Sequence, residues 1–245
     1  MRATFGGLHA LDSASFSVAR GKTTGLIGPN GAGKTTLFNA ITGLLPHARG
    51  SIRFNGADIS GMRPEKITSQ GLIRTFQLAR GCPRMTVFEH LMLYGQQQPG
   101  EGFWAGLLGG AASRAREQDL QEKAWAMARR LKLDHVLDNL VPALSGGQKK
   151  LLEIGRALLA EPKMILLDEP MAGVNPTLVG QISEQLEAVR DAGISVLIIE
   201  HDMALIRRLS DEVVVMAQGK YLTHGSFGEV TSDSRVQSSY LGKSR

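Results

Sequence analysis

The sequence predicts an α/β fold built on a parallel β-sheet. Near the N-terminus, a short apolar strand leads into a glycine-rich loop and then into a helical pattern. From Met164 onward, short apolar runs alternate with helical stretches. Strands that are covered by helices on both faces read as continuous apolar runs of this kind. A helix-rich stretch lies between the two parts, so we expect one domain that carries a helical insertion.

The composition is that of an ordinary globular protein, with 42% hydrophobic and 21% charged residues among 245. The formal net charge of +5 suits a protein that handles phosphates or lies beside anionic lipid. It is too small to indicate nucleic-acid binding, so no nucleic-acid partner is expected. The single cysteine, Cys82, excludes an intramolecular disulfide and favours a reducing compartment. Residues 1–10 lack the apolar core of a signal peptide, and the apolar run at 102–112 is too short to span a bilayer.

The first part of the chain predicts short strands separated by turn residues. Asn55-Gly56 is a strong hairpin-turn signal, because both residues tolerate positive φ. The strands are expected where β-branched and apolar residues cluster between such turns. The expected elements are strands over 14–18, 23–27, 51–54 and 72–76, and a short helix over 64–70.

Helices dominate the middle of the chain. Thr86, followed by Glu89 three residues later, forms a capping box that begins one helix. Apolar residues recur at helical spacing over 113–132, which predicts a second helix. Between them lies a Gln- and Gly-rich stretch with Phe103 and Trp104. This aromatic pair either packs within the helical part or contacts a partner protein.

The glycine-rich loop has the pattern G-x-x-x-x-G-K-[ST] between a strand and a helix. Glycines let successive backbone N–H groups turn inward around a polyphosphate, and the following helix adds its positive end. Lys34 would reach the β- and γ-phosphates, and the Thr35 hydroxyl would hold Mg²⁺. The loop predicts nucleoside triphosphate binding. It reads Gly28-Pro29-Asn30-Gly31-Ala32-Gly33-Lys34-Thr35-Thr36.

A second cluster begins an amphipathic helix that Pro162 ends. Ser145 is a good N-cap, and Gly146 and Gly147 leave backbone amides unobstructed at the positive helix end, followed by Gln148. Taken alone, this stretch is either an anion-binding helix end or simply a cap and a turn.

A third cluster ends the apolar strand that begins at Met164. Asp168 and Glu169 follow four apolar residues, so both lie at the carboxyl edge of the sheet, where ligands of α/β folds bind. Asp168 can hold Mg²⁺, and Glu169 can orient and deprotonate an attacking water. Acidic residues also end strands as plain surface features, but here they accompany a phosphate loop.

The three clusters together resemble the ATP-binding subunit of ABC transporters. The resemblance covers nearly the whole chain, and the Leu-Ser-Gly-Gly-Gln stretch is its specific signature. It implies a P-loop NTPase (RecA-like) core with an antiparallel β subdomain and an inserted α-helical subdomain. It further implies a single ATP-binding domain over 1–245, with residues 1–77 and 142–245 as core and 78–141 as the helical insert. ATP and Mg²⁺ are the implied cofactors.

The family also implies roles for residues in the three clusters and beyond them. Two ATP-binding subunits face each other head to tail, so Ser145 and its neighbours through Gln148 would contact the γ-phosphate held by the partner. Gln77 matches the family glutamine loop, which senses Mg²⁺ and water and contacts the membrane subunit. His201 matches the switch histidine, which holds the γ-phosphate and orients Glu169.

Two further positions match the family with differences. Phe5 stands where an aromatic residue stacks on adenine, although an edge-strand core aromatic fits the sequence as well. Family members usually have a strand before this aromatic, and four residues precede it here, so we expect a later-assigned start or an unprotected sheet edge. Asn175, in the dimer-contact loop, replaces the more common Asp and is a plausible N-cap.

Within the family, the chain is similar to the larger ATPase of branched-chain amino-acid importers, with urea and amide importers and the lipopolysaccharide exporter as alternatives. The implied partners are a second ATP-binding subunit, identical or paralogous, and transmembrane permease subunits. The implied location is cytoplasmic, peripheral on the inner membrane. A soluble ABC ATPase of DNA repair or translation is the competing class. The DNA-repair proteins carry a long coiled coil and the translation proteins carry two cassettes in one chain. This chain has neither feature.

Overall fold

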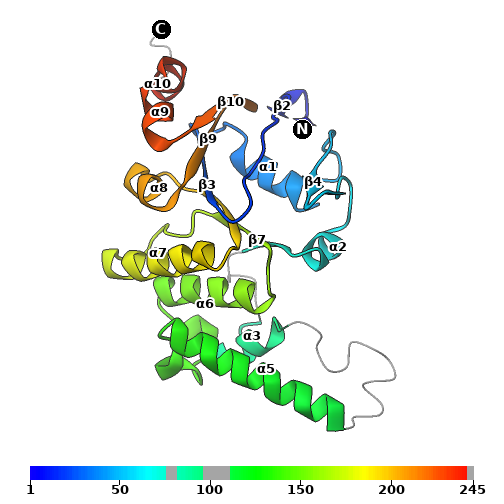
Figure 1. Ribbon diagram of the computed structural model, residues 1–245, viewed down its shortest axis with the longest axis vertical. Helices are drawn as coiled ribbons and strands as arrows, with labels where there is room; N and C mark the ends of the chain where they lie inside the picture. The colour runs from blue at the N-terminus through cyan, green and yellow to red at the C-terminus, as the bar shows by residue number, and fades with distance from the viewer. Residues whose placement is uncertain (76–81, 96–110, 242–245) are drawn as a thin grey trace. The chain divides into compact units, whose positions relative to one another are not determined.

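The computed structural model describes residues 1–75, 82–95 and 111–241 (Figure 1). The chain divides into two compact units. The first contains Met1–Arg74, Lys163–Pro170 and Leu186–Arg245, and the second contains Thr75–Pro162 and Met171–Gln185.

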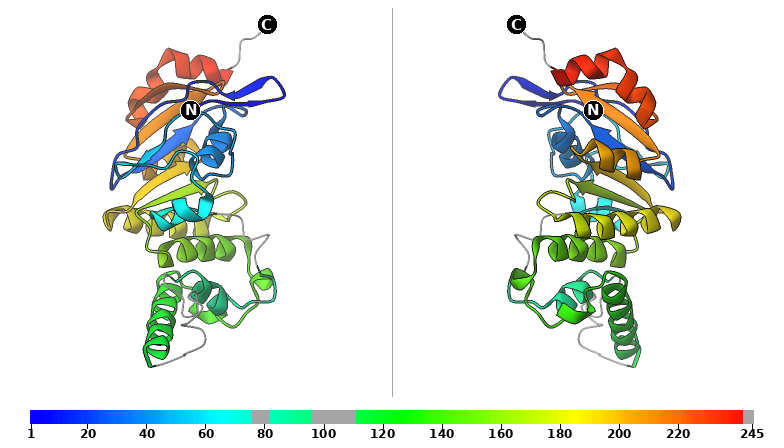
Figure 2. Two further views of the ribbon diagram at one scale, coloured as in Figure 1. Left: turned by 90° about the vertical axis from the view of Figure 1, so that its right-hand side faces the viewer. Right: turned by 90° about the vertical axis from the view of Figure 1, so that its left-hand side faces the viewer.

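A sheet of six described strands forms the centre of the first unit, in the order β10-β9-β3-β8-β7-β6 (Figure 2). All neighbours are parallel except β10, which pairs antiparallel with β9. Every residue of β3 and β8 is buried, as expected for strands covered on both faces. The predicted parallel α/β core is therefore confirmed. The strands are β3 (Thr23–Ile27), β6 (Leu72–Arg74), β7 (Met164–Asp168), β8 (Ser195–Ile199), β9 (Glu212–Ala217) and β10 (Lys220–Gly225).

Two short hairpins accompany this sheet: β1 (Ala3–Phe5) with β2 (Leu8–Leu11), dark blue in Figure 2, and β4 (Arg53–Phe54) with β5 (Ala57–Asp58). Asn55 and Gly56 join β4 to β5 with φ of 49° and 84°. Positive φ at both central positions is the hairpin geometry that these residues favour, so the predicted turn is confirmed.

The prediction of a strand over residues 14–18 is wrong, because the structure has no strand there. Phe16 and Val18 pack against the core, so the alternation of buried and exposed residues is real. Among the residues that the structure describes, however, the backbone of this stretch pairs only at Ala14, which exchanges hydrogen bonds with Met1 at 3.1 and 2.6 Å. Alternation reports burial, and a strand also needs a neighbouring ladder.

The helices of the first unit cover its sheet, and the last of them lies near the C-terminus of the chain. Phe38, in the first of these helices, is fully buried and packs with Leu26 and Leu166 of the sheet in one core cluster. The helices are α1 (Lys34–Ile41), α2 (Pro64–Ser69), α8 (Met203–Leu209), α9 (Phe227–Ser232), α10 (Ser234–Leu241) and the last turns of α7 (Pro176–Asp191).

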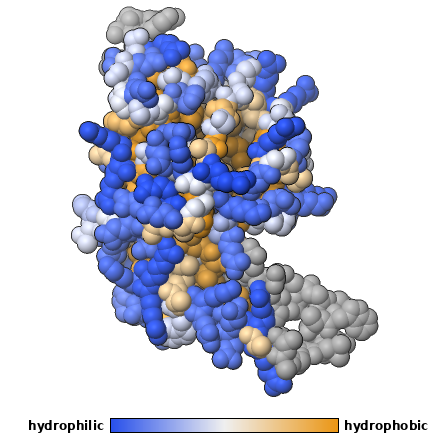
Figure 3. Space-filling model, viewed as in Figure 1, coloured by the Kyte–Doolittle hydropathy of each residue, from blue (hydrophilic) through white to orange (hydrophobic). Residues whose placement is uncertain are grey.

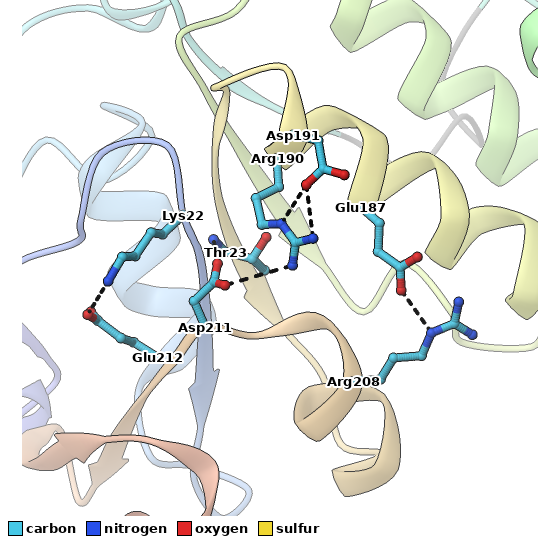
Figure 4. Close-up of polar contacts among 8 residues, drawn as sticks. All are labelled: Lys22, Thr23, Glu187, Arg190, Asp191, Arg208, Asp211 and Glu212. Carbon is cyan, nitrogen blue, oxygen red and sulfur yellow. Dashed lines mark hydrogen bonds and ion pairs between the residues drawn. The ribbon is translucent and has the colours of Figure 1, made fainter.

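Charged residues connect α7 and α8 with the amino ends of β3 and β9 (Figure 4). Asp211, the residue before β9, accepts a hydrogen bond from the backbone N–H of Thr23 at 2.8 Å. These contacts lie at the end of the parallel strands opposite to the carboxyl edge. The ion pairs drawn are Lys22–Glu212, Arg190–Asp191, Arg190–Asp211 and Arg208–Glu187.

The second unit is helical. The Thr86–Glu89 capping box is confirmed: Glu89 N–H donates to Thr86 Oγ1 at 3.2 Å, and Thr86 N–H donates to Glu89 Oε2 at 2.7 Å. Gly155 permits close packing of two helices, because an added Cβ would lie 3.3 Å from Met127 Cγ on the neighbouring helix and 2.5 Å from Leu131 Cδ1 just after that helix. The described elements are α3 (Val87–Leu93), α5 (Ala111–Arg130), η2 (Asp134–Val136), η3 (Val141–Ala143), α6 (Gly146–Leu159) and the first part of α7.

Within the described ranges, the helices are all too short or too polar to traverse a lipid bilayer. Figure 3 shows mostly hydrophilic side chains over one face of the molecule, with hydrophobic ones between them.

Candidate functional site

The glycine loop connects β3 to α1, and its glycines are required for two different physical reasons. Gly28, Gly31 and Gly33 have φ of 152°, 77° and 94°, a region that residues with a Cβ avoid. An added Cβ would lie 2.0 Å from Met216 O at Gly28 and 2.4 Å from Ala10 O at Gly33. At Gly31 it would meet nothing within 4 Å. The loop is therefore fixed by close backbone contact at its two ends and by backbone conformation in the middle.

Lys34 is the first residue of α1 and is buried. Its Nζ donates to Gly28 O at 2.7 Å and to Pro29 O at 3.2 Å, so the ammonium lies inside the loop. Burial lowers the pKa of Lys34, and the nearby carboxylates of Glu169 and Asp168 oppose this shift. A cation held by carbonyl oxygens and short of solvent is well suited to meet a phosphate. Beyond it, Thr35 is exposed and Thr36 is half-buried.

Asp168 ends β7 and Glu169 directly follows it, so both lie at the carboxyl edge, as predicted. Glu169 has φ of 49°, and its N–H donates to Ile199 O of the neighbouring strand at 2.9 Å. A left-handed residue at this point turns the backbone sharply, so two consecutive carboxylates can take different directions. This is the arrangement that separate roles for the two side chains require.

His201 follows β8 and contacts Glu169. Its Nε2 lies 2.7 Å from Glu169 Oε1. The next residue, Asp202, is the N-cap of α8 and accepts from the N–H groups of Ala204 and Leu205 at 2.8 and 3.2 Å. This cap fixes the turn that carries the histidine. The side chains of His201 and Glu169 remain 49% and 43% exposed, so a water can reach them.

Asp168 has a partner that no sequence motif indicates. Arg74, at the end of β6, lies 3.0 Å from Asp168 Oδ2 through Nη2. Only the position of this arginine at the end of a buried strand, on the same sheet edge as Asp168, could have indicated it.

Phe5 lies on β1 with half of its surface exposed. The neighbouring strand β2 approaches the glycine loop, since Ala10 O is the atom that a Cβ at Gly33 would meet. The C-terminal helix also reaches the loop: burial raises the pKa of the Tyr240 hydroxyl, and a hydrogen bond with the Gly28 backbone opposes this. No local pattern in the sequence places Tyr240 at the loop.

Ser145 caps α6 in the second unit, as predicted. Gln148 N–H donates to Ser145 Oγ at 3.3 Å, and Ser145 N–H donates to Gln148 Oε1 at 2.9 Å, which completes a capping box. The predicted cap at Asn175 is also present, since its Oδ1 accepts from Leu178 N–H at 2.9 Å.

The two glycines of this stretch have different surroundings. A Cβ on Gly147 would lie 2.2 Å from Leu178 Cδ1, whereas one on Gly146 would lie 3.8 Å from Gly173 O. Gly147 is therefore needed for packing, and Gly146 is exposed with room for a methyl group.

The oxygen donors Thr35 and Asp168 fit Mg²⁺, which binds a few protein oxygens and completes its shell with water and phosphate. In the part of the chain that the structure describes, no group of three or more His, Cys, Asp or Glu side chains is placed to hold a metal. Gln77, predicted as a catalytic and Mg²⁺-sensing residue, and the Phe103-Trp104 segment lie outside the described residues.

Comparison with known proteins gives a family match and full-length relatives. Residues 11–172 match a family model described as ABC transporter. The probable branched-chain amino acid transport ATP-binding protein LivG of Methanocaldococcus jannaschii is 40% identical over 248 residues, covering 98% of this chain and 94% of the relative. The high-affinity branched-chain amino acid transport ATP-binding protein BraF of Pseudomonas aeruginosa is 35% identical over 240 residues, with 98% and 94% covered.

Solved structures agree with these sequence matches. A nucleotide-free ATP-binding cassette from an ABC transporter superposes with a TM-score of 0.84 at 39% identity, covering 99% of this chain and 96% of the other. The ADP conformation of the cassette MJ1267 gives a TM-score of 0.83 at the same identity and coverage.

Proposed function

We propose a function from one premise: this chain belongs to the ABC transporter family. It is an ATP-binding and ATP-hydrolysing subunit of a transporter. We infer that it energises import of branched-chain amino acids, because the relatives that match nearly its whole length carry that description. The observation that carries the catalytic proposal is the Glu169–His201 contact beside a buried loop lysine.

ATP hydrolysis divides among the residues of the carboxyl edge. Lys34 and the backbone amides of residues 30–36 hold the phosphates, and Phe5 stacks on adenine. Thr35, Gln77 and Asp168 are the proposed Mg²⁺ residues, and the ion supplies charge neutralisation on the transferred phosphoryl group. Glu169 accepts a proton from the attacking water, and His201 holds the carboxylate in place.

A second ATP-binding subunit, identical or paralogous, completes each site in this proposal. Ser145, Gly146, Gly147 and Gln148 contact the γ-phosphate bound by that partner. Support comes from the capped helix end and from the exposed Gly146, which leave backbone amides accessible to an anion.

The remaining partners are transmembrane permease subunits, with no nucleic acid involved. The protein then acts as a peripheral protein on the cytoplasmic face of the inner membrane. The chain is one ATP-binding domain over 1–245, in which residues 1–77 and 142–245 form the core and 78–141 the helical part that faces the permeases.

Reconstitution with candidate permeases and a solute-binding protein in proteoliposomes tests this function. ATP-dependent uptake of radiolabelled leucine, isoleucine or valine is expected. Uptake of urea or short amides instead, or export of lipopolysaccharide, would correct the substrate while retaining the ATPase. Absence of ATP hydrolysis in the full-length protein would overturn the catalytic proposal.

A further inference from the structure

Arg74 contacts side chains on the strand β7 and on the helix α1. Its Nη2 lies 3.0 Å from Asp168 Oδ2 on β7, and its Nη1 donates to Asn39 Oδ1 on α1 at 2.6 Å. Its Cζ lies 5.5 Å from the ring centroid of Phe38, also on α1. The guanidinium is therefore held on two edges and stacked on one face.

This ion pair is largely withdrawn from water. The side chains of Arg74 and Asp168 are 8% and 22% exposed. A buried pair stabilises a fold only when its geometry is good and its other polar atoms are satisfied. A guanidinium has rigid, divergent donors that can serve a carboxylate and an amide at once, which a lysine ammonium on a flexible stem cannot reproduce.

The contacts connect the metal carboxylate to the phosphate loop. Helix α1 begins at Lys34, directly after the glycine loop, and carries Thr35 in its first turn. Through Asn39 and Phe38, Arg74 fixes Asp168 to that same helix. Arg74 is also the last residue of the first unit before the chain enters the second unit at Thr75.

We propose that Arg74 is a positioning residue, which holds Asp168 in the orientation that Mg²⁺ requires relative to the phosphate loop. This inference rests on the proposed function, in which Asp168 is a Mg²⁺ residue. Arg74 occupies Oδ2 of the carboxylate, so Oδ1 would be the oxygen available to Mg²⁺ or to a water that it binds. Groups that orient metal ligands in this way typically change metal affinity 10- to 100-fold.

A competing role would be charge compensation, in which Arg74 neutralises Asp168 and is displaced when the metal binds. The two roles predict opposite effects, because a competitor weakens Mg²⁺ binding and a positioning residue strengthens it. The additional anchors on Asn39 and Phe38 favour positioning, since they hold the guanidinium in place independently of Asp168.

The test is a Mg²⁺ titration of nucleotide binding to the full-length protein. The fluorescence of a bound N-methylanthraniloyl ATP analogue is the readout. Arg74→Met and Arg74→Lys are expected to raise the half-saturating Mg²⁺ concentration about tenfold. Asn39→Leu is expected to raise it by a smaller factor, about threefold. Nucleotide binding in EDTA is expected to stay within about twofold for all three, because Arg74 acts through the metal residue.

Arg208→Met is the matched control, because it also removes an arginine from an ion pair. Arg208 lies 2.9 Å from Glu187, and both residues are far from the glycine loop in the sequence (Figure 4). It should leave the Mg²⁺ dependence unchanged. Asp168→Asn is the reference for the metal site itself. If Asp168→Asn binds Mg²⁺-nucleotide like the wild type, the proposed metal site fails.

If Asp168→Asn raises the half-saturating Mg²⁺ concentration while Arg74→Met leaves it unchanged or lowers it, only the positioning role fails. A wild-type Mg²⁺ dependence of Arg74→Lys would also overturn it, because charge alone would then suffice. Thermal melting checks folding before each titration. If Arg74→Met does not fold, Arg74→Lys and Asn39→Leu decide the question.

Discussion

Oε1 of Glu169 lies 2.7 Å from Nε2 of His201, although 32 positions separate the two residues in the chain. They follow the adjacent parallel strands β7 and β8, whose carboxyl ends meet at one edge of the sheet. An ionised carboxylate only accepts hydrogen bonds, so the imidazole donates through Nε2 in this pairing. The contact holds one carboxylate oxygen and leaves Oε2 for a water.

Glu169→Gln is expected to lower kcat for ATP hydrolysis by about 10²- to 10⁴-fold, because an amide cannot take a proton from water. ATP binding should be retained, and the protein should accumulate as an ATP-bound dimer. Phosphate release measures turnover, and light scattering after size exclusion with Mg²⁺-ATP measures the dimer. Hydrolysis at the wild-type rate would show that Glu169 is not the base.

His201→Ala is expected to lower kcat with little change in ATP affinity, because the carboxylate loses the donor that holds it. His224→Ala is the matched control, since that histidine instead contacts the Tyr221 hydroxyl at 2.7 Å on β10. Steady-state ATPase assays of both variants separate the two positions. Equal losses in kcat would mean that the Glu169 contact has no special role.

Ser145→Ala should cost about 1 kcal/mol of stability through the lost helix cap. Ser226→Ala removes an equivalent capping box, in which Glu229 N–H donates to Ser226 Oγ at 3.4 Å, and should cost a similar amount. Only Ser145→Ala is expected to weaken ATP-dependent dimerisation, because only that cap belongs to the proposed partner contact. Urea unfolding and dimer assays check the two effects, and parallel behaviour of both variants would contradict the role in dimerisation.

Gly31→Ala should cost about 1 kcal/mol, the strain of positive φ in a residue with a Cβ. Gly33→Ala should cost clearly more, because its Cβ would also meet Ala10 O at 2.4 Å and the backbone must move. Equilibrium urea unfolding in the absence of nucleotide compares the two midpoints. Equal shifts would show that the loop relaxes freely around Gly33.

The lowered pKa of Lys34 predicts a pH dependence of ATP binding. The charged form costs free energy in the folded, nucleotide-free site. This penalty is complete below the lowered pKa and disappears as the pH rises past the ordinary value of 10.5. Bound phosphates raise the pKa again, so ATP binding should take up protons and weaken as the pH rises through the lowered pKa.

Isothermal titration calorimetry in alkaline buffers of different ionisation enthalpy measures this proton uptake. Lys34→Arg is the control, because a guanidinium stays protonated over the range. If Lys34→Arg shows the same uptake as the wild type, another group titrates.

The sequence predicted the parallel core because β3, β7 and β8 are buried on both faces and read as apolar runs. It also predicted the caps at Thr86, Ser145 and Asn175, since a cap depends on residues three positions apart. It misplaced a strand at 14–18, because a hydrogen-bonded ladder depends on distant partners. The pairing of β10 with β9 likewise follows from contacts that local pattern does not contain.

Much of the candidate site could also be predicted, because its motifs combine unusual residues at fixed spacing. Arg74 was missed, because its role depends on Asn39 and Asp168, which are 35 and 94 positions away. No local pattern marks such a pair. Gln77 remains a prediction from its resemblance to the family.

The left-handed backbone at Glu169 restricts which inactive variants are informative. A β-branched replacement such as valine or threonine would strain that turn and disturb the adjacent Asp168 along with the chemistry. Asparagine tolerates such a conformation well, and glutamine keeps the length of the original side chain. In a mutant library at this position, β-branched variants should therefore lose folding stability as well as turnover. Unbranched variants such as asparagine and glutamine should lose turnover alone.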